Sequence, residues 1–150
     1  MELRDKVVVV TGGASGIGTG LCRRFREEGV RGLVIADLNG EAAAELAEEL
    51  DGTSYALDVR DESAIAAMVA ETEAEFGQID LFCSNAGILN LDGDDYWATS
   101  SNNDVWQKNW EVHVMAHIYA ARACLPGMIE RGEGHFLHTV SAAGLLTQPY

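Results

Sequence analysis

A glycine-rich segment near the start of the chain has the residue types and spacing of a phosphate-binding turn. It reads Thr-Gly-Gly-Ala-Ser-Gly-Ile-Gly over residues 11–18 and directly follows a run of four valines, which predicts a buried strand. Gly12 lets the chain turn, Gly16 lets the backbone approach a diphosphate, and Gly18 lets the following helix pack closely on the strand. Strand, glycine turn and helix together predict a dinucleotide-binding site.

The start of that helix and the end of the next strand complete the predicted cofactor site. Unpaired backbone N–H groups around Ser15 and Ile17 would hold the diphosphate. Asp37 ends the next apolar run, about 20 residues after the glycine turn, where a carboxylate accepts hydrogen bonds from ribose hydroxyls. The Asp37 carboxylate would repel the 2′-phosphate of NADP. Ala14 and Leu38 stand where a basic side chain would be needed to bind that phosphate. The sequence therefore favours NAD over NADP.

The elements that must position these residues alternate between helix and strand, with no linker or repeat. Strands are predicted over 7–10, 33–37, 54–59, 80–84 and 135–140. Helices are predicted after the glycine turn to about 28, and over 40–50, 61–77 and about 105–129. Helices of this length between strands imply right-handed crossovers. The expected fold is α/β, a Rossmann-type doubly wound parallel sheet with its first five strands present.

Composition excludes several classes of function. The hydrophobic fraction is 47%, yet no apolar run approaches the ~20 residues that span a bilayer. A net charge of −14 argues against nucleic acid or an anionic membrane as a partner. The N-terminus has no signal-peptide pattern, and an odd number of widely spaced cysteines predicts packed, reduced thiols in the cytoplasm: Cys22, Cys83 and Cys124.

Five segments, in this order, resemble the single-domain short-chain dehydrogenase/reductases whose turn is TGxxxGxG. They are residues 11–18, Asp37, Asp58-Val59, Asn85-Ala86-Gly87 and Ser141-Ala-Ala-Gly144. The resemblance runs the whole length of the chain. It implies an NAD-dependent oxidoreductase that interconverts a secondary alcohol and a ketone, with residues 1–150 as the dinucleotide-binding portion of a longer single domain.

The resemblance also assigns roles to these residues. It implies that Asp58 bonds the adenine amino group, that Val59 adds a backbone contact, and that Leu38 lies beside the adenosine. Asn85 and its two neighbours would support the sheet and line the ribose site. Ser141 would hydrogen-bond the substrate, since a hydroxyl can donate to a carbonyl or accept from an alcohol. A homodimer or homotetramer is expected, with the helix of Trp110 in the interface.

Two departures from the family pattern stand out. In the family, a Tyr-x-x-x-Lys motif follows the serine by about a dozen residues, and the tyrosine is the general acid/base. The sequence stops at Tyr150 without that motif, so we expect a longer natural protein and an inactive 1–150 fragment.

His113 stands where the family has an asparagine that holds a relay water. It either takes part in that relay or only packs, and both interpretations stay open.

Other interpretations remain. A non-catalytic dinucleotide-binding or subunit-association module would also lack the tyrosine and lysine. A sugar-nucleotide epimerase shares the fold, but its turn reads TGxxGxxG. His113 and His117 are one helical turn apart without an evident third ligand, so no metal is predicted. Tyr96 and Trp97, in a polar acidic stretch, are candidates to cover the nicotinamide or the substrate.

Overall fold

Five parallel strands form the centre of the molecule. The computed structural model describes residues 1–89 and 101–142. The strand order is β3-β2-β1-β4-β5, and all four neighbouring pairs are parallel. The strands are β1 (Val7–Thr11), β2 (Gly32–Asp37), β3 (Thr53–Ala56), β4 (Leu81–Ser84) and β5 (His135–His138). The predicted parallel sheet of Rossmann type is confirmed.

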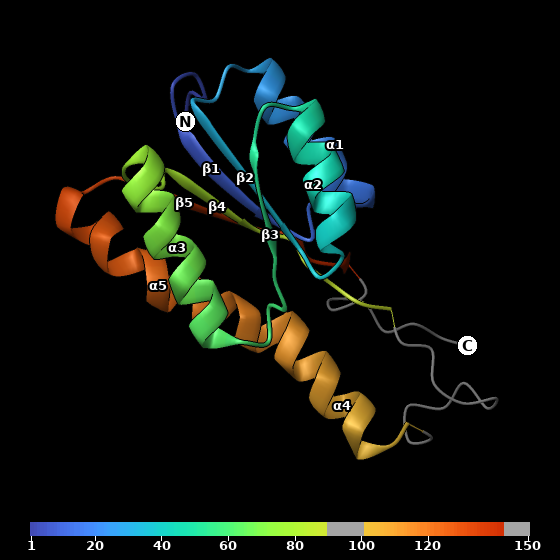
Figure 1. The fold of residues 1–150 in the computed structure, drawn as a ribbon. Coiled ribbons are helices and arrows are strands. Elements are labelled where there is room, and N and C mark those ends of the chain that lie inside the picture. The colour runs from blue at the N-terminus through green and yellow to red at the C-terminus, as the bar shows by residue number, and fades with distance from the viewer. Residues whose placement is uncertain (90–100, 143–150) are drawn as a thin grey trace.

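Helices cover both faces of this sheet (Figure 1). One face carries α1 (Gly16–Glu27) and α2 (Gly40–Glu49), and the other carries α3 (Glu62–Phe76) and α5 (Ala116–Arg131). Before α5, α4 (Asn103–Trp110) leads into a π-helical segment, η1 (Glu111–Met115).

The valine run of β1 builds both cores because successive strand side chains point to opposite faces. Val8 and Val10 pack in the cluster that contains residues of α1 and α2. Val7 and Val9 pack in the cluster on the α3 and α5 side. All four are fully buried, so β1 is central to both layers and its carboxyl end, where the glycine turn begins, is firmly placed.

Capping side chains and glycines set several helix boundaries. The Asn39 side chain accepts a hydrogen bond from the Ala42 N–H at 3.2 Å, at the start of α2. Asp61 caps α3 in the same way, and Gly77 ends that helix with φ +80°. After α2, however, the left-handed residue is Asp51 (φ 51°) and not a glycine.

Two predicted strands are shorter in the structure. β3 ends at Ala56, so Asp58 lies in a loop, where its backbone carbonyl accepts the Asp61 N–H at 3.0 Å. Its side chain also accepts the Arg60 N–H, and such local bonding competes with strand pairing. β5 ends at His138, so Ser141 follows the strand and is not part of it.

The predicted single helix over 105–129 is interrupted by η1. Val112, Ala116 and Ala120 face the core, whereas Trp106 and Trp110 lie on the outer side, 57% and 56% exposed. These tryptophans therefore do not pack in the core, and the predicted place of the Trp110 helix between subunits stays a prediction. No described helix is long and apolar enough to cross a membrane.

The three cysteines are buried and unpaired, as predicted. Cys22 and Cys83 belong to the cluster on the α1 side, and Cys124 to the opposite cluster. Burial raises the pKa of each thiol to about 12, so the thiols stay protonated and unreactive.

Candidate cofactor-binding site

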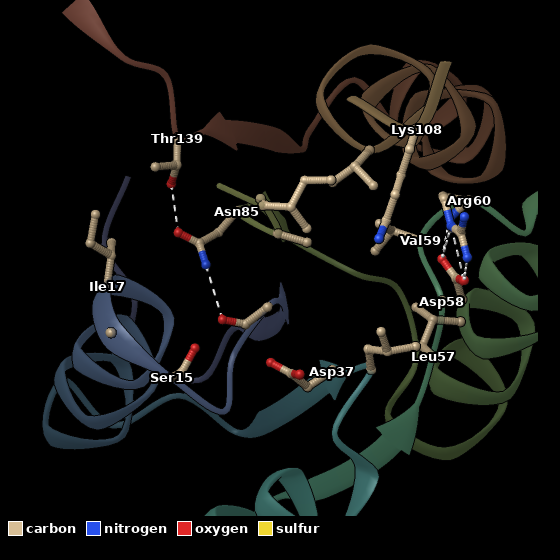
Figure 2. A pocket seen from close by; sticks show the side chains of 17 residues that line it. Ser15, Ile17, Asp37, Leu57, Asp58, Val59, Arg60, Asn85, Lys108 and Thr139 are labelled. Carbon is tan, nitrogen blue, oxygen red and sulfur yellow. Dashed lines mark hydrogen bonds and ion pairs between the residues drawn. The ribbon is translucent and has the colours of Figure 1, made fainter. Parts of the chain in front are cut away.

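A cavity of about 400 Å³ opens at the carboxyl ends of the strands (Figure 2). In parallel α/β sheets this edge is where ligands bind. On the side of β1 and β2 it is lined by the predicted residues Gly12, Ser15, Gly16, Ile17, Asp37 and Leu38. The segments after β3 and β4 add the predicted residues Asp58, Val59, Asn85, Ala86 and Gly87 to the lining. The structure thus gathers eleven of the twelve predicted cofactor residues into one hollow.

The twelfth residue, Gly18, shapes the turn from beneath. A Cβ atom added there would overlap the Gly12 carbonyl and lie 2.9 Å from Asn85 Nδ2. Gly12 has φ +63°, and its added Cβ would lie 2.7 Å from the Cα of Ala86. These two glycines are therefore required by packing, which is the role that the spacing assigned to Gly18.

Gly16 differs, because a Cβ added there meets nothing within 4 Å. It has φ +50° and begins α1, which starts at the cavity. Ser15 is the N-cap residue, yet its side chain makes no capping hydrogen bond. The first N–H groups of α1 consequently face an open space. The N-terminal end of the helix carries a partial positive charge, so this place suits a diphosphate.

Backbone N–H groups hold the Asp37 carboxylate at the edge of the cavity. Oδ2 accepts the Ala14 N–H at 3.0 Å, and Oδ1 accepts the Asn39 N–H at 2.9 Å. One bond ties the end of β2 to the glycine turn, and the other fixes the start of α2. Each carboxylate oxygen keeps a second lone pair, so Asp37 can still accept hydrogen bonds from two ribose hydroxyls.

Asn85 connects the ends of the central strands (Figure 2). Its Nδ2 donates to the carbonyls of Thr11 and Gly12, both at 3.1 Å. Its Oδ1 accepts from Thr139 Oγ1 at 2.8 Å. The amide is thereby oriented with its nitrogen toward the glycine turn and its oxygen toward β5, so its hydrogen bonds support the sheet.

Asp58 forms an ion pair with Arg60 on the far side of the cavity. Arg60 Nη2 lies 2.6 Å from Asp58 Oδ2, and Nε lies 3.0 Å from both carboxylate oxygens. Hydrogen bonding from Arg60 lowers the pKa of Asp58. The carboxylate is therefore a fixed anion at the edge of the cavity, and its oxygens are already engaged by Arg60.

Sequence reasoning missed six residues that line the cavity: Leu57, Arg60, Ile88, Lys108, Val112 and Thr139. Arg60 carries a signal, since it stands two residues after a predicted site acid. Lys108 belongs to α4 and Val112 to η1, and no local pattern links them to the glycine turn. Only the tertiary fold brings them there.

The two predicted catalytic residues are not among those that line this cavity. Ser141 follows Thr139, at the end of β5, and is exposed. His113 lies in η1, and its Nε2 is 3.0 Å from the carbonyl oxygen of Ile88. Since a carbonyl only accepts, Nε2 carries a proton in this contact, and in a neutral ring Nδ1 is then the acceptor.

His113 also packs against the loop after β4: a Cβ added to Gly87 would lie 3.2 Å from its Cε1. Among the described residues, no three His, Cys, Asp or Glu side chains are grouped to hold a metal ion. Tyr96, Trp97 and Tyr150 lie outside the described residues.

Comparison with known proteins shows which family the chain belongs to. The sequence profile of the short chain dehydrogenase family matches residues 6–150. The chain is 34% identical, over 97% of its length, to 1-deoxy-11-beta-hydroxypentalenate dehydrogenase of Streptomyces exfoliatus and covers 54% of that protein. It is also 34% identical, over 92% of its length, to an NADP-dependent 3-hydroxy acid dehydrogenase of Shigella flexneri, of which it covers 55%.

A solved structure shows the same arrangement. A short chain dehydrogenase/reductase from Burkholderia phymatum, in complex with NAD, superposes with a TM-score of 0.90 at 28% identity. The alignment covers 99% of this chain and 53% of that one. The chain thus spans about half the length of the relatives it matches. With the glycine turn, Asp37 and Asn85 assembled at one sheet edge, the chain belongs to the short chain dehydrogenase family.

Proposed function

We propose that the whole protein is an NAD-dependent oxidoreductase that interconverts a secondary alcohol and a ketone. The observation that carries the proposal is the Asp37 carboxylate, held at the cavity edge beside the open start of α1. A carboxylate there accepts ribose hydroxyls and repels a 2′-phosphate. Ala14 and Leu38, next to it, offer no cation to offset that repulsion.

The cavity fits a nicotinamide dinucleotide. Its volume of about 400 Å³ lies in the range of cofactor clefts, and Gly16 leaves the helix start open to a diphosphate. When bound, the cofactor supplies or takes up the hydride. The NAD complex of the Burkholderia relative supports this cofactor, whereas the Shigella relative is NADP-dependent, so Asp37 carries the choice between the two.

In this proposal the chain's own residues bind the cofactor, orient the substrate and hold a water. Asn85 fixes the ends of β1, β4 and β5 around the cofactor. Ser141 holds the substrate oxygen, as a donor to a ketone or an acceptor from an alcohol. His113, with Nδ1 as an acceptor, can hold a water near the loop after β4.

The test is a titration of the whole protein with NADH, followed by NAD reduction with a panel of secondary alcohols. Binding with turnover supports the proposal. Binding without turnover on any alcohol or ketone would favour the alternative of a non-catalytic dinucleotide-binding module. Absence of binding would overturn both.

We further propose a homodimer or homotetramer located in the cytoplasm. Exposed apolar side chains on α4 and α5 support the assembly: Trp106, Trp110, Ile118, Leu125 and Ile129. Exposed apolar patches of this kind mark interaction surfaces. The three buried, unpaired thiols support a reducing compartment. Light scattering of the whole protein would test the assembly, and a monomeric mass would contradict it.

A further inference from the structure

Two histidines that the proposed mechanism does not use meet a serine beside the central sheet. The hydroxyl oxygen of Ser84 lies 2.6 Å from Nδ1 of His117, and Nδ1 of His138 lies 3.2 Å from that same nitrogen. Ser84 ends β4, His138 ends β5, and His117 belongs to α5. Ser84 and His138 are also register partners in the sheet. Three elements therefore meet at one nitrogen atom.

The distance between the two imidazole nitrogens requires a proton between them. A neutral imidazole has one protonated and one bare nitrogen. Two bare Nδ1 atoms would oppose their lone pairs, and two protonated ones would oppose their hydrogens. One Nδ1 must donate while the other accepts. The Ser84 hydroxyl shares the same Nδ1 of His117: it donates to that nitrogen when it is bare and accepts when it is protonated, so the two contacts share one lone pair or one hydrogen.

The surroundings orient both rings and favour the neutral form of His117. Burial lowers the pKa of His117, and the nearby His138 and His113 lower it further. His138 stacks on Phe136 with ring planes 2° apart, and meets the His117 ring edge-on at 81°. The rings are therefore oriented by packing on one side and by the hydrogen bond on the other.

The cluster directly precedes the residues of the proposed site. Asn85 follows Ser84, and Thr139 follows His138. The Thr139 N–H donates to the Ser84 carbonyl at 3.3 Å, so backbone pairing continues past the histidine. Any slip of β5 against β4 would break the cluster and move Thr139, and with it the segment that carries Ser141.

We propose that His117 is a positioning residue that, through Ser84 and His138, holds the carboxyl ends of β4 and β5 in register for Asn85 and Ser141. Its effect on turnover rests on the proposed oxidoreductase function. The cluster itself does not, so the two can be tested apart.

The first test is long-range ¹H–¹⁵N NMR of the imidazoles in the whole protein near neutral pH. One of the two Nδ1 atoms, in His117 or His138, is expected to carry a proton while the other is bare. His138→Leu should shift the His117 nitrogen signals, and His135→Leu, at the other end of β5, should leave them in place. Two bare or two protonated Nδ1 atoms would overturn the proposal.

The second test compares His117→Asn with His117→Leu. The asparagine amide keeps a polar atom near the position of Nδ1, whereas leucine keeps the volume and removes the polar atom. We expect His117→Leu to lower kcat by about tenfold or more, and His117→Asn to stay within about threefold of the wild type, as for loss of one positioned hydrogen bond. NADH affinity should change little in both variants.

A purely structural role would reverse that order, because leucine fills the site better. Equal kcat in the wild type and His117→Leu, or no advantage of His117→Asn over His117→Leu, would contradict the positioning role. If the wild type neither binds NADH nor turns over an alcohol, the proposed function fails, and the NMR experiment alone decides on the cluster.

Discussion

Thr139 Oγ1 donates a 2.8 Å hydrogen bond to Oδ1 of Asn85 and so ties the end of β5 to the loop after β4. Asn85 in turn reaches the carbonyls of Thr11 and Gly12 through its Nδ2. A single amide thus links the ends of three strands. The edge of the sheet where the cofactor is proposed to bind is therefore held by side-chain bonds as well as by strand pairing.

Removing the hydroxyl of Thr139 should destabilise this edge. Thr139→Val leaves Asn85 Oδ1 without its donor, and we expect a loss of about 1–2 kcal/mol in the free energy of unfolding. Thr139→Ser keeps the hydroxyl and should cost less. Chemical denaturation of the whole protein measures both, and equal losses would contradict the role assigned to this bond.

Two glycines of α1 form a matched pair. Gly18→Ala forces a Cβ into the Gly12 carbonyl, so we expect a loss of roughly 1–3 kcal/mol or more in unfolding free energy. Gly20→Ala meets open space in the same helix and should stabilise it by up to about 1 kcal/mol. Thermal or denaturant melting compares them. Similar stabilities for the two variants would refute the packing role of Gly18.

Part of the candidate site could be predicted from the sequence alone. The glycine spacing, Asp37 and Asn85 were predicted because each sits next to its strand in the chain, and a parallel sheet brings strand ends together. Arg60, Lys108 and Thr139 were missed because their places depend on the direction of the loops and on where α4 lies relative to the ends of the strands. The early end of β3 and the π-helical η1 were not predicted either. Local hydrogen bonding by Asp58 ends β3, and tertiary packing overrides the helical periodicity at η1.

Asp37 should set the cofactor preference. We expect NADH to bind the whole protein at least tenfold more tightly than NADPH, a difference of about 1.4 kcal/mol, because the carboxylate repels the 2′-phosphate. Asp37→Ala should narrow that gap, while Glu41→Ala, which removes an exposed acid of α2, should not. Calorimetric titration of the wild type and the two variants with each cofactor gives the three pairs of affinities needed. Equal affinity of the wild type for NADH and NADPH would refute the claim.

Ser141 and His113 should affect turnover differently. Ser141→Ala is expected to lower kcat by roughly 10²–10⁴, the range for losing a positioned polar group, with NADH affinity little changed. His113→Asn should keep most activity if the side chain only holds a water, and should shift the pH profile if the imidazole relays protons. Steady-state kinetics of the whole protein separate these outcomes. An unchanged kcat in Ser141→Ala, or a large loss of NADH affinity, would show that the assigned role is wrong.

The most direct measurement is a crystal structure of the whole protein grown with NADH. The account predicts the diphosphate over the N–H groups at the start of α1, between Ser15 and Ile17, and the adenosine ribose hydroxyls within hydrogen-bond distance of Asp37. The nicotinamide should lie toward Asn85 and the end of β5. A dinucleotide bound away from this edge of the sheet, or a ribose that Asp37 does not contact, would contradict the account.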